Sequence, residues 1–567
     1  MIDSFISSVV DALTSIGFDI SSAKMQSYRA VGEIEQTMED TDGEELTSLL
    51  ERIEPSLRGA CEAILGAPIE HMLVAPIPQY LEPILPQLIQ AFPRVVLADN
   101  FRVGQQICGQ RCISLTDALE TQYDAYFLGT FMCHLAKFFR NQFPLAKTID
   151  TWALRAHAHT LSGSARTPQS EKLLAQVNSV PFPIIFLTAY LDATMIPTLL
   201  ALKDRGRELF VVVRRPLRNS GAAVQDTVVL DSLSIFRLNF HEMLDLLEHN
   251  VSAPVVVNYQ RFFASNWDVK NTIFLYAYSI AILNAIKSRK ILHLYDIYNA
   301  CAHGFECADK AGHLYHKMLI AADGILINSE TLGVFDEFDF GGKPILSFLR
   351  YAPKVEPLPR VAHGGKHIVC ITGFLGEHDD PTRATSKAIR SLLLRGFHIH
   401  YYSDDLKSKA FGNDLPAEDL DRFHLYAPIS DQAALVQEIS QYDAGWLGID
   451  VRPVMGLERH YSSEFGKKLA SVFAATSCAT AALYYGAAGL PVFVTEGYYP
   501  LKLFGKHAGL PVRLTTDGDI ADQEQTFSRI DLAAAKRAVV RERFMIDQHI
   551  EKLDRWLDQF SQQKIYK

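Results

Sequence analysis

The hydroxyl side chains of Ser477 and Thr480 stand inside an apolar stretch, and they could bind phosphate. The stretch, residues 469–495, has 27 positions without a charged side chain. Small residues after Thr480 predict a helix, residues 489–491 (Gly-Leu-Pro) end it, and residues 492–494 predict a buried strand. The N-terminus of such a helix offers free N–H groups to an anion. We therefore interpret the stretch as a ligand-binding element of a soluble enzyme, and not as a membrane span.

Other parts of the chain must position this helix, and the length and composition of the chain limit what those parts can be. A chain of 567 residues predicts three or four domains. Its net charge of −10 argues against a dedicated nucleic-acid binder. Eight scattered cysteines and an acid-containing N-terminus without a basic segment indicate a cytoplasmic protein.

Alternating strand and helix patterns predict an α/β fold. We expect two doubly wound Rossmann-like domains, preceded by a helical segment and a small α/β domain. The predicted parts are a helical segment 1–58, a small Rossmann-like domain 59–150, a connector 151–180, a first doubly wound domain 181–342, a Pro-rich linker 343–365, a second doubly wound domain 366–530 and a C-terminal helix 531–567 that packs back.

The sequence gives weaker indications of the role of the two N-terminal parts, residues 1–58 and 59–150. The helical segment needs a partner surface, either the next domain or another copy of the chain, so self-association stays open. The small domain resembles Rossmann-like domains found beside sugar-modifying enzymes, through Asp99-Asn100, Val103-Gly104 and Tyr123-Asp124. Its first strand is followed by residues 75–78 (Ala-Pro-Ile-Pro) where a dinucleotide site would have G-x-G-x-x-G, which favours a docking or oligomerisation role.

Residues 181–560 resemble the GT-B glycosyltransferases of the family 4 and family 1 type. Residues 424–449 (HLYAPISDQAALVQEISQYDAGWLGI) look like the family's base-binding strand, loop and helix. Residues 476–494 (TSCATAALYYGAAGLPVFV) look like its diphosphate and ribose helix, and residues 321–330 (AADGILINSE) are similar to a strand of its first domain. The resemblance implies a hexosyltransferase-type enzyme with a nucleotide-diphosphate sugar on the second domain and an acceptor on the first.

The resemblance also implies the site residues. The donor-binding candidates are Gly373, Phe374, Ala427, Pro428, Ile429, Ser477, Thr480, Tyr484 and Glu496. Many members have a ribose-binding Glu where this chain has Tyr484, so donor identity and activity stay open. Because a helix dipole and hydroxyls can replace a divalent metal, neither a metal nor a cofactor is expected.

An inverting mechanism needs a base on the first domain, for which Asp296 and Asp192 are the catalytic candidates, with His293 and His303 behind them. A retaining mechanism needs no such base, and the sequence does not choose. The Cys and His residues between 301 and 316 match no zinc spacing. Asp517 and Asp519 copy a metal-binding D-x-D, but they lie in a polar Gly turn.

Three functions stay open. The first is a glycosyltransferase with a glycan, lipid-linked or protein acceptor, serving cell-surface glycan or glycoprotein synthesis in bacteria, with peripheral membrane association left open. The second is a catalytically silent scaffold that binds a nucleotide sugar or an assembly partner, and the third is a sugar-nucleotide epimerase of the same two-domain shape.

Overall fold

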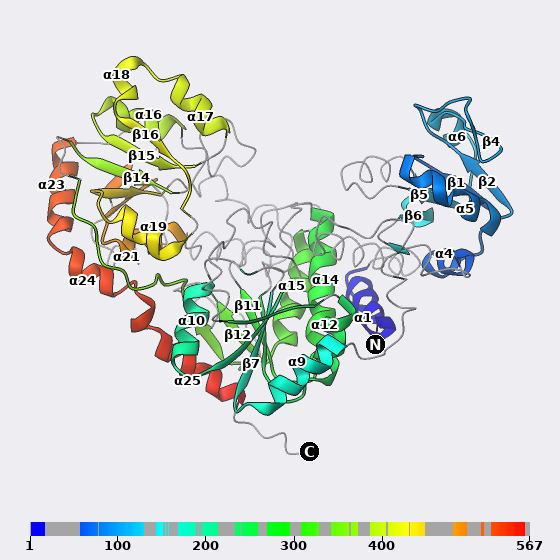
Figure 1. Cartoon of the computed structure of the whole chain (residues 1–567), viewed down its shortest axis with the longest axis horizontal. Helices are drawn as coiled ribbons and strands as arrows, with labels where there is room; N and C mark the ends of the chain where they lie inside the picture. Colours follow the sequence, from blue (N-terminus) through cyan, green and yellow to red (C-terminus); the bar gives the residue numbers. More distant parts are fainter. Residues whose placement is uncertain are drawn as a thin grey trace.

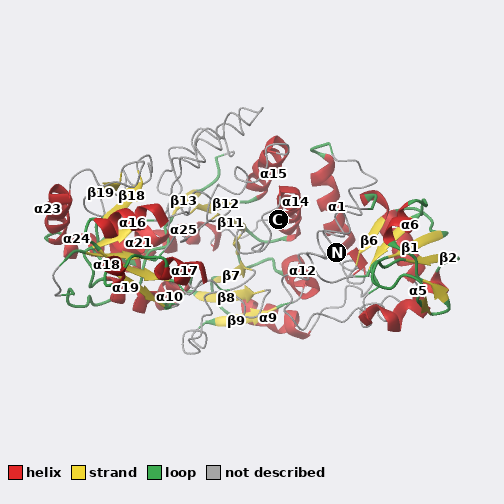
Figure 2. Ribbon diagram, turned by 90° about the horizontal axis from the view of Figure 1, so that it is seen from above, coloured by secondary structure: helices red, strands yellow, loops and turns green. Residues whose placement is uncertain are grey.

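The structure is a computed structural model. It describes residues 2–17, 57–77, 79–129, 143–150, 153–154, 157, 168–188, 191, 195–213, 233–238, 240–258, 269–294, 308–327, 342–361, 365–371, 386–403, 406–429, 431–447, 480–495, 512–514 and 523–561. Three parallel sheets follow one another along the molecule (Figures 1 and 2). Within these ranges no helix combines the length and apolarity needed to cross a membrane.

The smallest sheet belongs to the N-terminal α/β domain. Its strand order is β2-β1-β5-β6, from strands β1 (His71–Val74), β2 (Arg94–Leu97), β5 (Ala125–Leu128) and β6 (Thr148–Asp150). The 3₁₀ helix η1 (Gln79–Ile84) and α5 (Leu85–Ala91) connect β1 to β2, and α6 (Leu115–Leu119) precedes β5. At the carboxyl end of β5, a Cβ added to Gly129 would meet the side chain of Leu81 and the carbonyl of Pro76. Asp99 accepts hydrogen bonds from the backbone of Ile77 and Phe101, which is a structural role.

The first doubly wound domain has seven parallel strands in the order β13-β12-β11-β10-β7-β8-β9. The strands are β7 (Pro183–Thr188), β8 (Glu208–Val213), β9 (Ser234–Arg237), β10 (Val255–Asn258), β11 (Lys290–Leu294), β12 (Gly324–Ile327) and β13 (Ile345–Ser347). Its central strands are apolar on both faces, as expected for a parallel sheet with helices on both sides.

Each face of this sheet has its own core. One core joins the sheet to α9 (Pro168–Ser179), α12 (Phe240–His249), α14 (Val269–Ala285) and α15 (Ala308–Ala321). The other joins it to α10 (Ile196–Asp204) and to the last helix of the chain, α25 (Ile550–Ser561).

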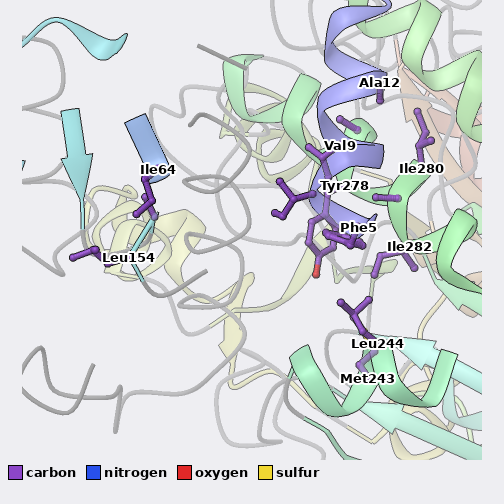
Figure 3. Close-up of a cluster of buried hydrophobic side chains, with 14 of the residues drawn as sticks. Phe5, Val9, Ala12, Ile64, Leu154, Met243, Leu244, Tyr278, Ile280 and Ile282 are labelled. Atoms are coloured by element: carbon purple, nitrogen blue, oxygen red, sulfur yellow. The ribbon is translucent and has the colours of Figure 1, made fainter. Parts of the chain in front are cut away.

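The N-terminal helix α1 (Ile2–Thr14) packs on α14 of the same chain. Phe5 meets Tyr278 edge to face, with ring centroids 5.1 Å apart. Figure 3 shows Phe5 and Val9 directed toward Tyr278, while Ile64 and Leu154 lie apart from them, beside the small domain. The partner surface of α1 is therefore the first doubly wound domain.

The second doubly wound domain has six parallel strands in the order β16-β15-β14-β17-β18-β19. The strands are β14 (His367–Cys370), β15 (His398–Tyr402), β16 (Phe423–Tyr426), β17 (Ala444–Trp446), β18 (Val492–Thr495) and β19 (Val512–Leu514). One face is covered by α16 (Ser386–Leu394), α17 (Leu406–Asn413) and α23 (Gln523–Ala534), and the other by α19 (Gln432–Ile439), α21 (Thr480–Ala487) and α24 (Arg537–Glu542). The short helix α18 (Ala417–Leu420) precedes β16.

The chain returns from the second doubly wound domain to the first through its C-terminal helices (Figure 1). Helix α25 buries Leu553, Trp556, Leu557 and Phe560 against the first sheet and α10. Arg207 donates to Asp554 at 2.5 Å and to Asp558 at 2.5 Å, and Arg205 donates to Asp554 at 2.8 Å. Apolar contact and a half-buried ion-pair network together dock this helix.

Asp554→Asn is expected to destabilise the protein by about 1–2 kcal/mol, because it removes the charge that two guanidinium groups share. The side chains of Arg207 and Asp554 are only 10% and 14% exposed, so water screens this pair little. The matched control is Glu551→Gln on the same helix, because its pair with Arg555 is 53% and 76% exposed. Urea unfolding should show that the control substitution lowers the free energy of unfolding by less than about 0.5 kcal/mol. Equal costs for the two variants would contradict a docking role for Asp554.

The α/β fold class with two doubly wound domains is confirmed. Two segments differ from the prediction. The expected connector 151–180 contains α9, because Leu173, Leu174 and Val177 form an apolar stripe that packs on α12. The expected linker 343–365 begins with β13, which pairs with β12 and extends the first sheet.

Candidate nucleotide-sugar site between the two doubly wound domains

Helix α21 (Thr480–Ala487) is the central element of the candidate site, and the sequence predicts a helix over these residues. The seven residues after Thr480 are all buried, which explains why this part of the uncharged stretch is apolar on every side of the helix. The Tyr485 hydroxyl donates to the carbonyl of Trp446 at 2.8 Å and accepts from the N–H of Ile371 at 3.0 Å. It thereby joins the carboxyl ends of β14 and β17. These two strands flank the point where the strand order reverses, which is where sheets of this type bind ligands.

The C-terminus of α21 is held by the chain's last helices. Gly489 has φ +73°, a conformation that ends the helix and favours glycine. Arg541 donates to the carbonyl of Ala487 at 3.0 Å and so places a cation at the negative end of the helix. The Gly489 turn and the Arg541 hydrogen bond together fix the axis of α21 and therefore the position of its N-terminus.

The N-terminus of α21 meets a cation from the first domain. Arg350 lies just beyond the carboxyl end of β13, and its Nη1 donates to Oγ1 of Thr480 at 2.9 Å. The helix N-terminus, the Thr480 hydroxyl and the guanidinium all attract negative charge. This contact joins the carboxyl edge of one sheet to the candidate phosphate-binding helix of the other.

A row of polar side chains lies at or near the carboxyl ends of the central strands of the first sheet, where Thr188 and Asn258 are buried and His293 is half-buried. Thr188 ends β7, Asn258 ends β10, and His293, in β11, is the register partner of Asn258. Strand alternation places the three side chains on the face covered by α10. Asn258 donates to the sulfur of Met195 at 2.7 Å, which fits that placement. Strands β7 and β10 flank the switch point of this sheet.

His293 is electrostatically coupled to Arg350. Burial, and then the positive charge of Arg350, lower the pKa of His293 to about 3. The imidazole is therefore neutral near neutral pH, and it is too weak a base to deprotonate an acceptor hydroxyl efficiently. Both side chains line a cavity of about 30 Å³ together with Thr198 of α10. This volume suits one water molecule or a small group, but not a sugar ring.

The predicted base-binding loop follows β16. Ala427 and Pro428 are exposed and Ile429 is half-buried. Asp431 caps the next helix, α19, by accepting a hydrogen bond from the N–H of Ala434. The loop is therefore held between an edge strand and a capped helix, with its surface accessible.

Tyr484 is 7% exposed and lies in the apolar core between α19, α21 and α24. The structure thus places the Tyr484 side chain in the core of the second domain, whereas the resemblance implies a residue at this position that contacts the ribose. The remaining predicted residues Asp192, Asp296, Gly373, Phe374, Ser477 and Glu496 lie outside the described residues, as does His303.

Some of the candidate metal ligands named from the sequence lie within the described ranges. No group of three or more His, Cys, Asp or Glu side chains able to hold a metal occurs within the described ranges. His313 and His316 lie on α15, and burial lowers the pKa of each. Cys301, Cys307, Asp517 and Asp519 lie outside the described residues.

Comparisons with known proteins give structural matches alone. No protein family and no curated protein matches the chain. A glycosyltransferase from Rickettsia africae is 12% identical, with 68% of this chain and 100% of that chain covered and a TM-score of 0.41. A Listeria monocytogenes protein named as a UDP-N-acetylglucosamine 2-epimerase is 10% identical, with 68% and 98% covered and a TM-score of 0.41. The pneumococcal O-GlcNAc transferase GtfA, in complex with UDP and GlcNAc, is 12% identical, with 56% and 59% covered and a TM-score of 0.34. This chain thus spans 59% of the length of GtfA.

The sheets themselves define the fold. Two doubly wound sheets are joined by a Pro-rich segment, and the last helix returns from the second domain to pack on the first. This is the GT-B arrangement. Thr188 and Asn258, which lie at strand ends, and Arg350, whose side chain contacts the second domain, were not predicted from the sequence. A polar residue at the end of an apolar strand is the signal that marks the first two.

Proposed function

We propose that the protein is a glycosyltransferase that takes its sugar from a nucleotide-diphosphate donor. The observation that carries the proposal is the contact between Arg350 and Thr480 at the N-terminus of α21. A nucleoside diphosphate gains negative charge as it leaves the sugar, and this arrangement stabilises such charge. The same groups can do so without a divalent metal, so we propose metal-independent transfer.

The first domain would hold the acceptor. Ligands of such sheets bind at the carboxyl ends of the strands near the switch point, and this is the side from which Arg350 reaches the second domain. His293, with its pKa near 3, fits a hydrogen-bonding role and not that of the base. Asp296 and Asp192 remain our candidates for the base, and a glycan, lipid-linked or protein acceptor in cell-surface glycan or glycoprotein synthesis remains our proposal for the pathway.

The test is a thermal-shift screen of the full chain with UDP, GDP, ADP and the corresponding nucleosides. At a concentration 100 times its Kd, a bound nucleotide adds about 2.7 kcal/mol of stability, which raises the Tm of a cooperative unit as large as the whole chain by about 2 °C and that of a smaller unit by more. The diphosphate should stabilise the protein and its nucleoside should have a much smaller effect. Incubating the matching nucleotide sugar with and without glycan acceptors then distinguishes transfer from epimerisation and from silent binding. If no diphosphate raises Tm, the proposed function is wrong.

A further inference from the structure

The edge of the second sheet carries four histidines on one face. His367 lies on β14, His398 and His400 lie on β15, and His424 lies on β16. Strand register places His367 beside His398 and His400 beside His424. We call these four residues the histidine cluster.

Direct hydrogen bonds and ring stacking hold the histidine cluster together. Nδ1 of His367 lies 2.9 Å from Nε2 of His400, and Nδ1 of His400 lies 3.1 Å from the hydroxyl of Tyr426. The rings of His400 and His424 stack with centroids 4.6 Å apart, and those of His367 and His398 stack at 4.6 Å. Four imidazoles at these separations cannot all carry charge, because each proton taken up repels the next.

The groups that face the histidine cluster compensate little for added positive charge. The surrounding titratable and charged groups are Arg360, Tyr402, Asp421, Tyr426, Glu438, Tyr442 and Asp443. Glu438 already accepts a hydrogen bond from Tyr402, and Asp443 accepts from the backbone of His367 and pairs with Arg360. Burial, and then the other three histidines, lower the pKa of His400 to about 3. Burial also lowers the pKa of His424, although Asp421 opposes the shift.

The strand that carries His424 and Tyr426 is the edge of the sheet. Among the described strands β16 pairs with β15 alone, and Tyr426 is exposed. An edge strand with one neighbour can separate locally at a lower free energy than a central strand. Residues 427–429, the predicted base-binding loop, follow β16 directly.

We propose that the β15–β16 edge is an acid-opened element, closed while the histidine cluster is neutral and separating locally as its imidazoles take up protons. The sign follows from linkage: a histidine held neutral in the closed edge and exposed in the open one favours opening as pH falls below its ordinary pKa of about 6.5. Opening would also displace loop 427–429 and weaken nucleotide binding, a consequence that rests on the proposed function.

Hydrogen exchange measured by mass spectrometry on the full chain tests the proposal. From about pH 7.5 to about pH 5.5, the opening equilibrium of β15 and β16, corrected for intrinsic exchange, should rise about tenfold for each histidine that stays neutral when closed. Strands β7 and β8 of the other domain carry no histidine and serve as the internal reference. His424→Phe keeps the stacked ring but removes one proton site, so it should reduce the rise several-fold. His313→Asn, on exposed α15 surface, should leave the rise unchanged.

Two results would overturn the proposal. One is a wild-type β15–β16 edge whose opening changes no more with pH than that of β7 and β8. The other is a His424→Phe variant with the same pH response as wild type. Neither result depends on a ligand, so both are distinguishable from a failure of the nucleotide screen.

Discussion

Arg350→Gln is expected to weaken binding of the nucleoside diphosphate by roughly 10- to 100-fold, while binding of the nucleoside changes little. Hydrogen bonds to a charged group contribute about 1.5–3 kcal/mol, and a glutamine amide keeps a donor but loses the charge. Arg350 reaches Oγ1 of Thr480 at 2.9 Å, so a phosphate at the start of α21 would lie within reach of its guanidinium. Isothermal titration calorimetry with the nucleotide identified in the screen measures the effect.

Three comparisons make this result specific. Arg350→Lys keeps the charge without the planar fork and should lose less affinity than Arg350→Gln. Arg289→Gln removes an exposed guanidinium next to the amino end of β11 and should leave affinity unchanged. Raising the salt concentration should reduce the difference between wild type and Arg350→Gln, because it screens the attraction to phosphate. A diphosphate affinity that is equal in wild type and Arg350→Gln would exclude Arg350 as a phosphate ligand while leaving nucleotide binding itself intact.

Much of the second doubly wound domain could be predicted from local patterns. Apolar runs such as residues 367–370 and 492–495 become buried strands, and the Gly-Leu-Pro ending of α21 lies where the sequence predicts it. These features depend on residues close in the chain, where turn chemistry and apolar periodicity dominate. The short strands β9 and β13 were not predicted, because runs of four and three residues are too short to show a strand pattern and owe their conformation to pairing with β8 and β12.

The candidate site was harder to predict because its parts are far apart in the chain. Arg350 and Thr480 are separated by 130 positions, and nothing around Arg350 distinguishes it from an ordinary linker residue. The row from Thr188 to His293 depends on strand order and register, which bring β7, β10 and β11 side by side. Sequence patterns specify the strands, whereas the sheet topology decides which strand ends meet.

The contact between Gly445 of β17 and Tyr485 places α21 on its sheet. A Cβ at Gly445 would lie 2.5 Å from both Cδ1 and Cγ of Tyr485, a distance that real Cβ contacts do not show. The Tyr485 ring cannot easily move away, because it is buried and its hydroxyl is bonded to both Trp446 and Ile371. Gly445→Ala is therefore expected to destabilise the second domain by about 3 kcal/mol, near the upper end of the usual cost of overpacking. It should also weaken nucleotide binding, because moving α21 separates Thr480 from Arg350.

Gly412→Ala is the matched control for this prediction. Its Cβ would meet the ring of Phe423 at 3.4 Å, an ordinary contact, and it lies in helix α17, where alanine is favoured over glycine by about 1 kcal/mol. Urea unfolding followed by circular dichroism should show a loss for Gly445→Ala and no loss for Gly412→Ala. Combining Gly445→Ala with Tyr485→Leu relieves the clash, so the pair should cost less than the sum of the single variants. Additive costs would show that α21 is not held against β17 by this contact, and the position of its N-terminus would then need another explanation.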